Sequence, residues 1–180
     1  MDVSFKDMTN FIIKEGAAEI PHTKKTYLAH AIGVYNDLKA WGCDPELCRA
    51  AMFHSIYGTE GFQDFKLPLT RRDELRAFIG ERAERIVYWN CAMDRASFYE
   101  ANLTQTEAPY RIIDRLTQQE VELSTQDFDD LSRVHLCDFL EQVARSDIWH
   151  VQRATFRKMA ERLGGTALEA YERVFAQAPV

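Results

Sequence analysis

Apolar residues recur along the chain with the spacing of amphipathic helices. The first such stretch contains Phe5, Met8, Phe11 and Ile12, which would share one face of a helix over residues 4–14. The same spacing, with glycine, proline and capping residues at the ends, predicts further helices. These cover residues 23–41, 45–57, 70–79, 81–92, 125–146, 148–163 and 166–176. The pattern predicts an all-α protein of about seven or eight helices.

Two segments between these helices lack helical periodicity. Residues 94–109 show no clear period and contain a proline, so they are expected to form a loop with at most a turn of helix. In residues 110–123, the apolar runs Ile112–Ile113 and Val121–Leu123 flank a polar turn and can pair as a small β-hairpin. Because no repeat or linker is visible, the expected organisation is a single helical domain over residues 1–180.

Composition narrows the class of protein. A chain of 180 residues with 46% hydrophobic residues can bury a full core, and a net charge of −6 argues against a nucleic-acid partner. No apolar run reaches the length of a membrane span, and the N-terminus has no signal-like start. We therefore expect a cytoplasmic protein with no membrane partner. The four cysteines lack Cys-x-x-Cys spacing and are expected to be reduced thiols.

Two histidines lie symmetrically about a helix–helix turn. Gly42 ends one predicted helix, and Asp44 followed by Pro45 begins the next. His30 precedes Gly42 by twelve residues, and His54 follows Asp44 by ten. At ~1.5 Å rise per residue, both histidines lie at about the same height in an antiparallel pair. Two facing imidazoles can share one metal ion.

A third potential ligand is a carboxylate inside an apolar helical segment. Asp138 stands among Leu136, Cys137, Phe139 and Leu140. A buried lone carboxylate is very costly unless it is paired, protonated or bound to metal. One reading places Asp138 with the two histidines around a single ion. The alternative is that Asp138 caps a helix or pairs with an arginine of a neighbouring helix.

These residues resemble the HD-domain superfamily of metal-dependent phosphohydrolases and related oxygenases. Members are all-helical and carry a first His, a later His-Asp pair and a distant downstream Asp. His30 is similar to the first His, the run Ala50–Ile56 with His54 is similar to the segment leading into the pair, and Asp138 is similar to the downstream Asp. The resemblance covers roughly residues 23–146 and implies an HD-like domain with one divalent ion, Fe, Mn, Mg or Zn.

The chain departs from that family at one position, because Ser55 replaces the Asp of the His-Asp pair. A neutral hydroxyl is a poor ligand for a hard divalent ion. We therefore expect Ser55 to lie near the metal without coordinating it. The run Phe53–Thr59, with Leu38–Gly42 upstream, is similar to a little-characterised bacterial family of HD-like proteins. Only His135 occurs between Ser55 and the downstream Asp, which disfavours a second metal.

Further residues are candidates for proton transfer. Glu60 follows the histidine segment directly and can act as an acid or base. His22 precedes His30 by eight residues, or ~12 Å along a helix, so the two cannot bind one ion if both are helical. For each candidate there is a structural alternative: Glu60 in a solvated loop and His22 at a helix start.

Substrate contacts are expected from two places. Ser55, Tyr57 and Thr59, which follow His54, are expected to contact substrate, and the loop that begins at the end of the helix predicted over 45–57 can line the pocket mouth. Arg71 and Arg72 stand at a predicted helix start and can hold a phosphate or carboxylate. The alternative for the two arginines is a solvated, charged helix face.

The resulting functional hypothesis is a metal-dependent hydrolase of the phosphohydrolase kind. It would act on a small polar or phosphorylated metabolite through His30, His54 and Asp138, which would hold one divalent ion. Two alternatives stay open. The same ligand set suits a non-haem iron oxygenase, and the loss of the Asp at position 55 suits an inactive ligand-binding or interaction module. The sequence does not determine the oligomeric state.

Overall fold

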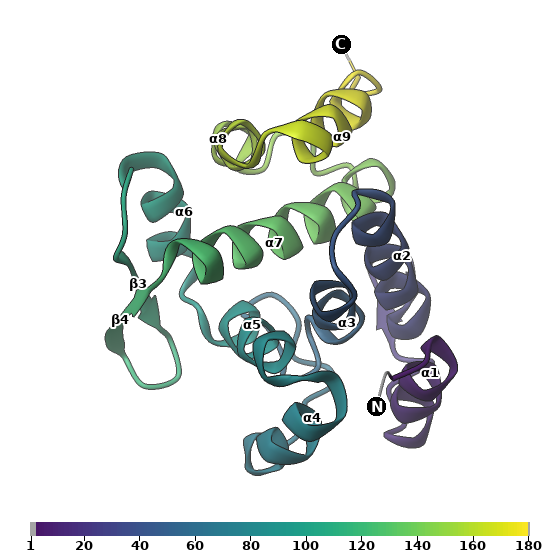
Figure 1. Ribbon diagram of the computed structural model, residues 1–180. Helices are drawn as coiled ribbons and strands as arrows, with labels where there is room; N and C mark the ends of the chain where they lie inside the picture. Colours follow the sequence, from purple (N-terminus) through teal and green to yellow (C-terminus); the bar gives the residue numbers. More distant parts are fainter. Residues whose placement is uncertain (1–2, 180) are drawn as a thin grey trace. The chain divides into compact units, whose positions relative to one another are not determined.

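The computed structural model describes residues 3–179 and is mostly helical (Figure 1). Within these residues there are nine α-helices and two small antiparallel hairpins, which confirms the all-α prediction. The helices are α1 (Phe5–Lys14), α2 (Tyr27–Ala40), α3 (Pro45–Phe53), α4 (Arg72–Ile79), α5 (Glu81–Ala92), α6 (Arg95–Thr104), α7 (Thr125–Ser146), α8 (Arg153–Leu163) and α9 (Gly165–Phe175). The strands are β1 (Pro21–His22), β2 (Lys25–Thr26), β3 (Tyr110–Asp114) and β4 (Gln119–Leu123), and η1 (Leu69–Arg71) is a 3₁₀ turn.

The chain forms two compact units in sequence. The first ends at Cys91 and the second begins at Ala92. A single domain over residues 1–180 would require these two units to associate into one body. That expectation stays a prediction.

In the first unit, α2 and α3 pack against each other across the turn that the sequence marks. Gly42 adopts φ 77°, and the Asp44 carboxylate caps α3 by accepting from the backbone N–H groups of Glu46 and Leu47. The predicted helix over 23–41 starts later than expected. Thr23 and Lys24 have φ of 46° and 61°, and they form the tight turn of the β1–β2 hairpin before α2.

The helix predicted over 45–57 also ends early, at Phe53. Beyond that point the chain turns tightly, since Ile56 N–H donates to the Phe53 carbonyl at 2.9 Å and Gly58 N–H donates to the Ser55 carbonyl at 2.9 Å. His54 is therefore the C-cap residue of α3, not an interior helical residue.

Thr70 and Asp73 have the spacing of a capping box, but α4 starts in another way. The turn η1 leads directly into α4, and no side chain caps it. Asp73 instead accepts a hydrogen bond from Arg76 at 2.8 Å. The helix ends as expected at Gly80, whose φ is 105°.

The second unit contains a helix that hydrophobic periodicity does not reveal. Residues 94–109 were expected to be mostly loop, but α6 occupies 95–104. Its N-terminus is capped by Asp94, whose carboxylate accepts from Ser97 N–H at 2.8 Å. The hairpin predicted in 110–123 is confirmed as β3 and β4, paired from Tyr110↔Leu123 to Asp114↔Gln119.

Helix α7 supplies much of the core of the second unit and begins where predicted. Ser124 caps it by accepting from Asp127 N–H at 3.1 Å. Helix α8 starts at Arg153, later than the predicted 148, after residues with left-handed backbone at Asp147 and Gln152. Helices α7, α8 and α9 pack against one another.

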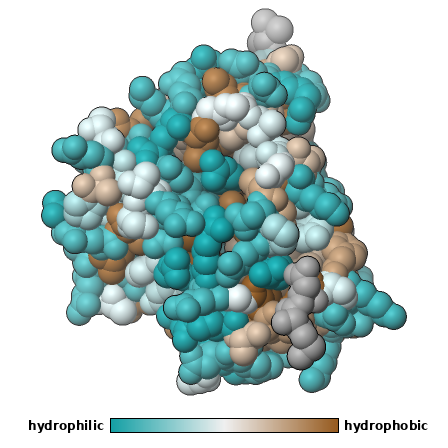
Figure 2. All heavy atoms as spheres, in the orientation of Figure 1, coloured by the Kyte–Doolittle hydropathy of each residue, from teal (hydrophilic) through white to brown (hydrophobic). Residues whose placement is uncertain are grey.

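Three further expectations from composition concern the surface, the cysteines and membrane-spanning helices. Figure 2 shows mostly hydrophilic side chains on the face drawn, with apolar side chains in small separate groups. All four cysteines are free thiols, as predicted, and three of them are buried. Within residues 3–179, no helix combines the length and the apolar character needed to cross a membrane.

Candidate metal centre

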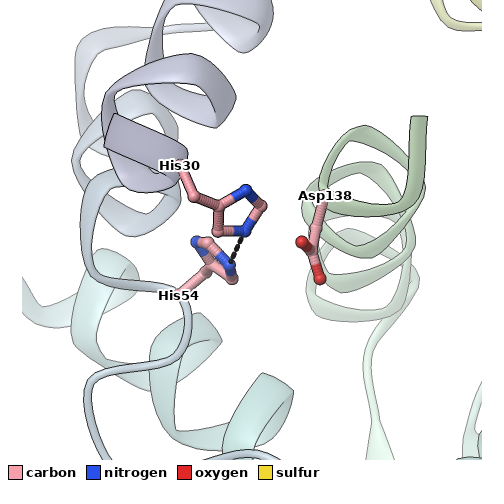
Figure 3. A group of neighbouring side chains, drawn as sticks. All are labelled: His30, His54 and Asp138. Carbon is pink, nitrogen blue, oxygen red and sulfur yellow. Dashed lines mark hydrogen bonds between the residues drawn. The ribbon is translucent and has the colours of Figure 1, made fainter. Parts of the chain in front are cut away.

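The first unit brings two buried imidazoles face to face. His30 lies near the start of α2 and His54 at the end of α3, with exposed fractions of 0% and 1%. Their Nε2 atoms are 3.2 Å apart (Figure 3). The equal height predicted from the spacing about Gly42 is therefore confirmed.

The hydrogen bonding of His54 fixes which of its nitrogens can bind a ligand. His54 Nδ1 lies 2.7 Å from the Ala51 carbonyl oxygen. Because a carbonyl only accepts, Nδ1 carries the proton in this contact. In the neutral ring, Nε2 then holds the lone pair and faces His30. This arrangement, with one ring nitrogen tied to a carbonyl, is common in metal-binding histidines.

The separation of the two imidazoles suits a shared ion. Nitrogen–metal bonds of about 2.0–2.1 Å place two ligand atoms about 2.9 Å apart at a right angle and about 3.3 Å apart at the tetrahedral angle. The observed 3.2 Å lies between these values. Without an ion, the same distance requires one proton between the two Nε2 atoms, donated by His30 to His54.

A third histidine lies against this pair. His22 belongs to β1, and its ring stacks on His30 with centroids 4.4 Å apart and planes 8° from parallel. The expected ~12 Å separation assumed that residue 22 continues the helix. Residue 22 is not helical, because the β1–β2 hairpin turns the chain back after it. The Thr23 hydroxyl lies 3.1 Å from His22 Nδ1. The role of His22 in proton transfer stays a prediction.

Asp138 lies on α7 in the second unit and is buried, with an exposed fraction of 7%. Its Oδ1 accepts a hydrogen bond from Gln142 Nε2 at 3.0 Å, one turn along the same helix. His30, His54 and Asp138 are thus all buried, and each offers a side-chain atom that can bind a metal ion.

The residues after His54 are more buried than a loop at a pocket mouth would be. Ser55, Tyr57 and Thr59 have exposed fractions of 2%, 5% and 4%. Thr59 Oγ1 accepts from Phe62 N–H at 3.1 Å, which closes the turn. Glu60, in contrast, is exposed. Substrate contacts by the three buried residues and proton transfer by Glu60 stay predictions.

The two arginines expected to hold an anion already hold carboxylates. Arg71 donates to Glu15 at 2.6 and 2.9 Å and to Glu74 at 2.7 Å, and Glu74, then Glu15, raise its pKa. Arg72 donates to both oxygens of Glu84, at 2.6 and 3.0 Å. The alternative expected for the arginines was a solvated, charged helix face, whereas both side chains are paired with carboxylates. Binding of a substrate anion at either one stays a prediction that requires exchange of a partner.

Glu84 is a buried carboxylate that sequence reasoning missed. It is fully buried, and it also accepts from the Tyr57 hydroxyl at 3.0 Å. Burial and then the charge of Glu84 raise the pKa of Tyr57. The available signal was its position three and seven residues before Val87 and Cys91, which places it on the apolar face of α5.

Comparison with known proteins identifies a similarity at the level of a protein family. The chain matches the model of a family described as a domain of unknown function, DUF6817, over residues 11–95. That segment contains both histidines of the pair and ends before Asp138. No curated protein matches the chain, and no solved structure matches it.

Proposed function

We propose that the chain is a metal-dependent hydrolase of the phosphohydrolase kind that acts on a small polar or phosphorylated metabolite. One divalent ion would be held by His30, His54 and Asp138. The ligand residues are similar in kind and order to those of HD domains, with Ser55 in place of one carboxylate.

A single observation carries this proposal. Two buried imidazoles of the first unit, His30 and His54, bring their Nε2 atoms to 3.2 Å from each other, the separation that a shared ion needs. Asp138 adds a buried carboxylate from the second unit. A buried carboxylate is costly without a counter-charge, and a buried imidazole nitrogen needs a partner. A divalent ion would supply that charge and satisfy all three groups.

Some residues of the chain would bind the ion, and others would orient the residues that bind it. His54 is held by its Nδ1–H bond to Ala51, so its Nε2 lone pair needs no reorientation to bind. Asp138 would contribute the negative charge, with Gln142 holding one of its oxygens. When bound, a divalent ion supplies polarisation of a phosphate and a lowered pKa of bound water.

A second function is favoured by the ligand types themselves. Two imidazoles and one carboxylate form the set used by non-haem Fe(II) oxygenases. Under this alternative the same three residues would hold iron, and the substrate would be oxidised instead of hydrolysed. The identity of the metal separates the two functions.

The test combines metal analysis with an activity assay. Purified protein is analysed for bound metals and then assayed for phosphate release from a panel of phosphate monoesters with Mn²⁺, Mg²⁺, Zn²⁺ or Fe²⁺. We expect one ion per chain and phosphate release that His30→Ala abolishes. His135→Phe, which changes a buried histidine of the second unit, is the matched control and should retain activity.

The other outcomes are equally definite. Bound iron with oxygen consumption, and no phosphate release, would favour the oxygenase. A chain that binds none of these metals would overturn the proposal and favour the ligand-binding module.

A further inference from the structure

Three oxygen atoms in the first unit are buried without a hydrogen-bond partner. They are the Tyr27 hydroxyl, the Ser55 hydroxyl and Asn90 Oδ1. The three residues have exposed fractions of 1%, 2% and 2%. Buried polar groups in native proteins nearly always have a partner, either protein or ordered water. These three residues, called the oxygen trio below, therefore point to a ligand.

The oxygen trio gathers around one peptide group. Asn90 Nδ2 donates to the His54 carbonyl at 2.8 Å, and Ser55 is the other half of that peptide. Cys91 Sγ lies 3.3 Å from the same carbonyl oxygen. The Ser55 hydroxyl and the Cys91 thiol are also close enough to Tyr27 to act on its pKa, although the Tyr27 and Ser55 hydroxyls do not meet in hydrogen-bond geometry. Helices α2 and α5 thus contribute one oxygen each, and the residue after the cap of α3 contributes the third.

The chemistry of the oxygen trio selects the ligand. Because Asn90 Nδ2 faces a carbonyl, the orientation of the amide is fixed, and Oδ1 can only accept a hydrogen bond. A fully deprotonated anion has no proton to give and cannot satisfy Oδ1. Burial raises the pKa of Tyr27, so its phenol stays protonated and can donate. A water molecule suits both groups, because it can donate to Oδ1 and accept from the phenol.

We propose that Tyr27, Ser55 and Asn90 bind one buried water molecule. The water would donate to Asn90 Oδ1, accept from the Tyr27 hydroxyl and form its third hydrogen bond with Ser55. Three bonds to otherwise unsatisfied groups are typical of a buried water. The bridge would join α2 and α5 to the His54–Ser55 peptide. It would therefore act as a positioning element for His54, whose ring faces His30.

The existence of the water is tested by stability. The cycle consists of the wild type, Tyr27→Phe, Asn90→Ala and the double variant, unfolded in urea. If both residues bind one water, Tyr27→Phe lowers the folding equilibrium constant by about threefold to tenfold, and its effect shrinks when Asn90 is already alanine. Tyr57→Phe combined with Asn90→Ala is the control, because the Tyr57 hydroxyl bonds Glu84 instead, and it should be additive.

Two results would overturn the water site. One is a Tyr27→Phe variant as stable as the wild type or more stable, which is expected when an unoccupied polar atom is removed. The other is strict additivity with Asn90→Ala. If a variant does not fold, a high-resolution crystal structure of the wild type decides the question, since density for a water must lie within hydrogen-bond distance of all three oxygens.

The positioning of His54 is tested by metal affinity, and this part rests on the proposed function. In calorimetric titration with Mn²⁺, Tyr27→Phe should raise Kd by about tenfold, as is usual when groups that support metal ligands are removed. An unchanged Kd would contradict the positioning role. If the wild type binds no Mn²⁺, the metal proposal fails, while the urea cycle still decides whether the water site exists.

Discussion

His54 in the first unit and His135 in the second are both buried histidines, yet their surroundings differ in kind. His135 lies among the rings of Phe98, Tyr99 and Phe156, with centroids 5.6, 5.7 and 5.6 Å away. Its Nε2 lies 3.1 Å from the Tyr99 hydroxyl. His54 instead directs Nε2 at a second imidazole nitrogen.

This difference shows which feature distinguishes a potential metal ligand from a buried structural histidine. Burial is common to both rings, and so is a hydrogen bond on one nitrogen. Only His54 has its remaining nitrogen aimed at another group that can bind metal. His135 is packed as an aromatic residue in the middle of α7, whereas His54 lies where α3 ends and the backbone turns.

Glu84 sharpens this comparison because it is a buried carboxylate with a structural role, held by Arg72 and the Tyr57 hydroxyl. Replacing it with alanine leaves Arg72 and the Tyr57 hydroxyl without the carboxylate they both contact. We expect the free energy of unfolding to fall by about 3–5 kcal/mol. Urea denaturation of Glu84→Ala checks this, with Glu74→Ala, an exposed partner of Arg71, as the control. A loss below about 1 kcal/mol would mean that the Glu84 network is not structural.

Asp138 provides the opposite case, a buried charge expected to serve the metal. Asp138→Ala should raise the Kd for Mn²⁺ by about 100-fold and remove activity together with it. Calorimetry and the phosphate assay measure both effects. If Asp138 only forms an ion pair, the variant instead loses about 3–5 kcal/mol of stability while its metal content is unchanged.

Ser55 tests the resemblance to HD domains. Ser55→Asp places a carboxylate at a buried position, so the metal-free variant should be less stable than the wild type. If position 55 faces the ion, the new ligand should raise Mn²⁺ affinity by about tenfold, and added Mn²⁺ should raise Tm more than in the wild type. Unchanged affinity in a folded variant would show that position 55 does not face the ion.

The smallest effect is expected at the histidine that is not a ligand. Tyr99→Phe removes the hydroxyl near His135 Nε2 and should lower the free energy of unfolding by about 1 kcal/mol. Metal affinity should stay the same. A loss of metal binding in this variant would break the distinction between the two histidines.

Much of the fold follows from local signals. Ser4, Asp44 and Ser124 cap α1, α3 and α7, and each stands before a clear apolar repeat. Asp94 is an equally good cap, but α6 was missed because its buried face includes the polar Asn102 and its exposed face includes Leu103. A capping signal without periodicity was too weak to identify this helix.

The candidate site also contains residues that local signals predict and residues that they do not. The histidine pair was predictable because equal distances from one turn place residues at equal height. His22 was not, since its approach to His30 depends on left-handed backbone at Thr23 and Lys24, which no proline or glycine marks. Asn90 reaches His54 only through packing within the first unit, and no local pattern encodes such a contact.

The central claim is that His30, His54 and Asp138 hold one metal ion. Calorimetric titration of metal-free protein with Mn²⁺ tests it most directly, with His54→Ala and His135→Phe measured beside the wild type. We expect one ion per chain in the wild type and in His135→Phe, and a Kd raised by more than about 100-fold in His54→Ala. Equal Mn²⁺ binding by wild type and His54→Ala, or none by the wild type, would contradict the claim.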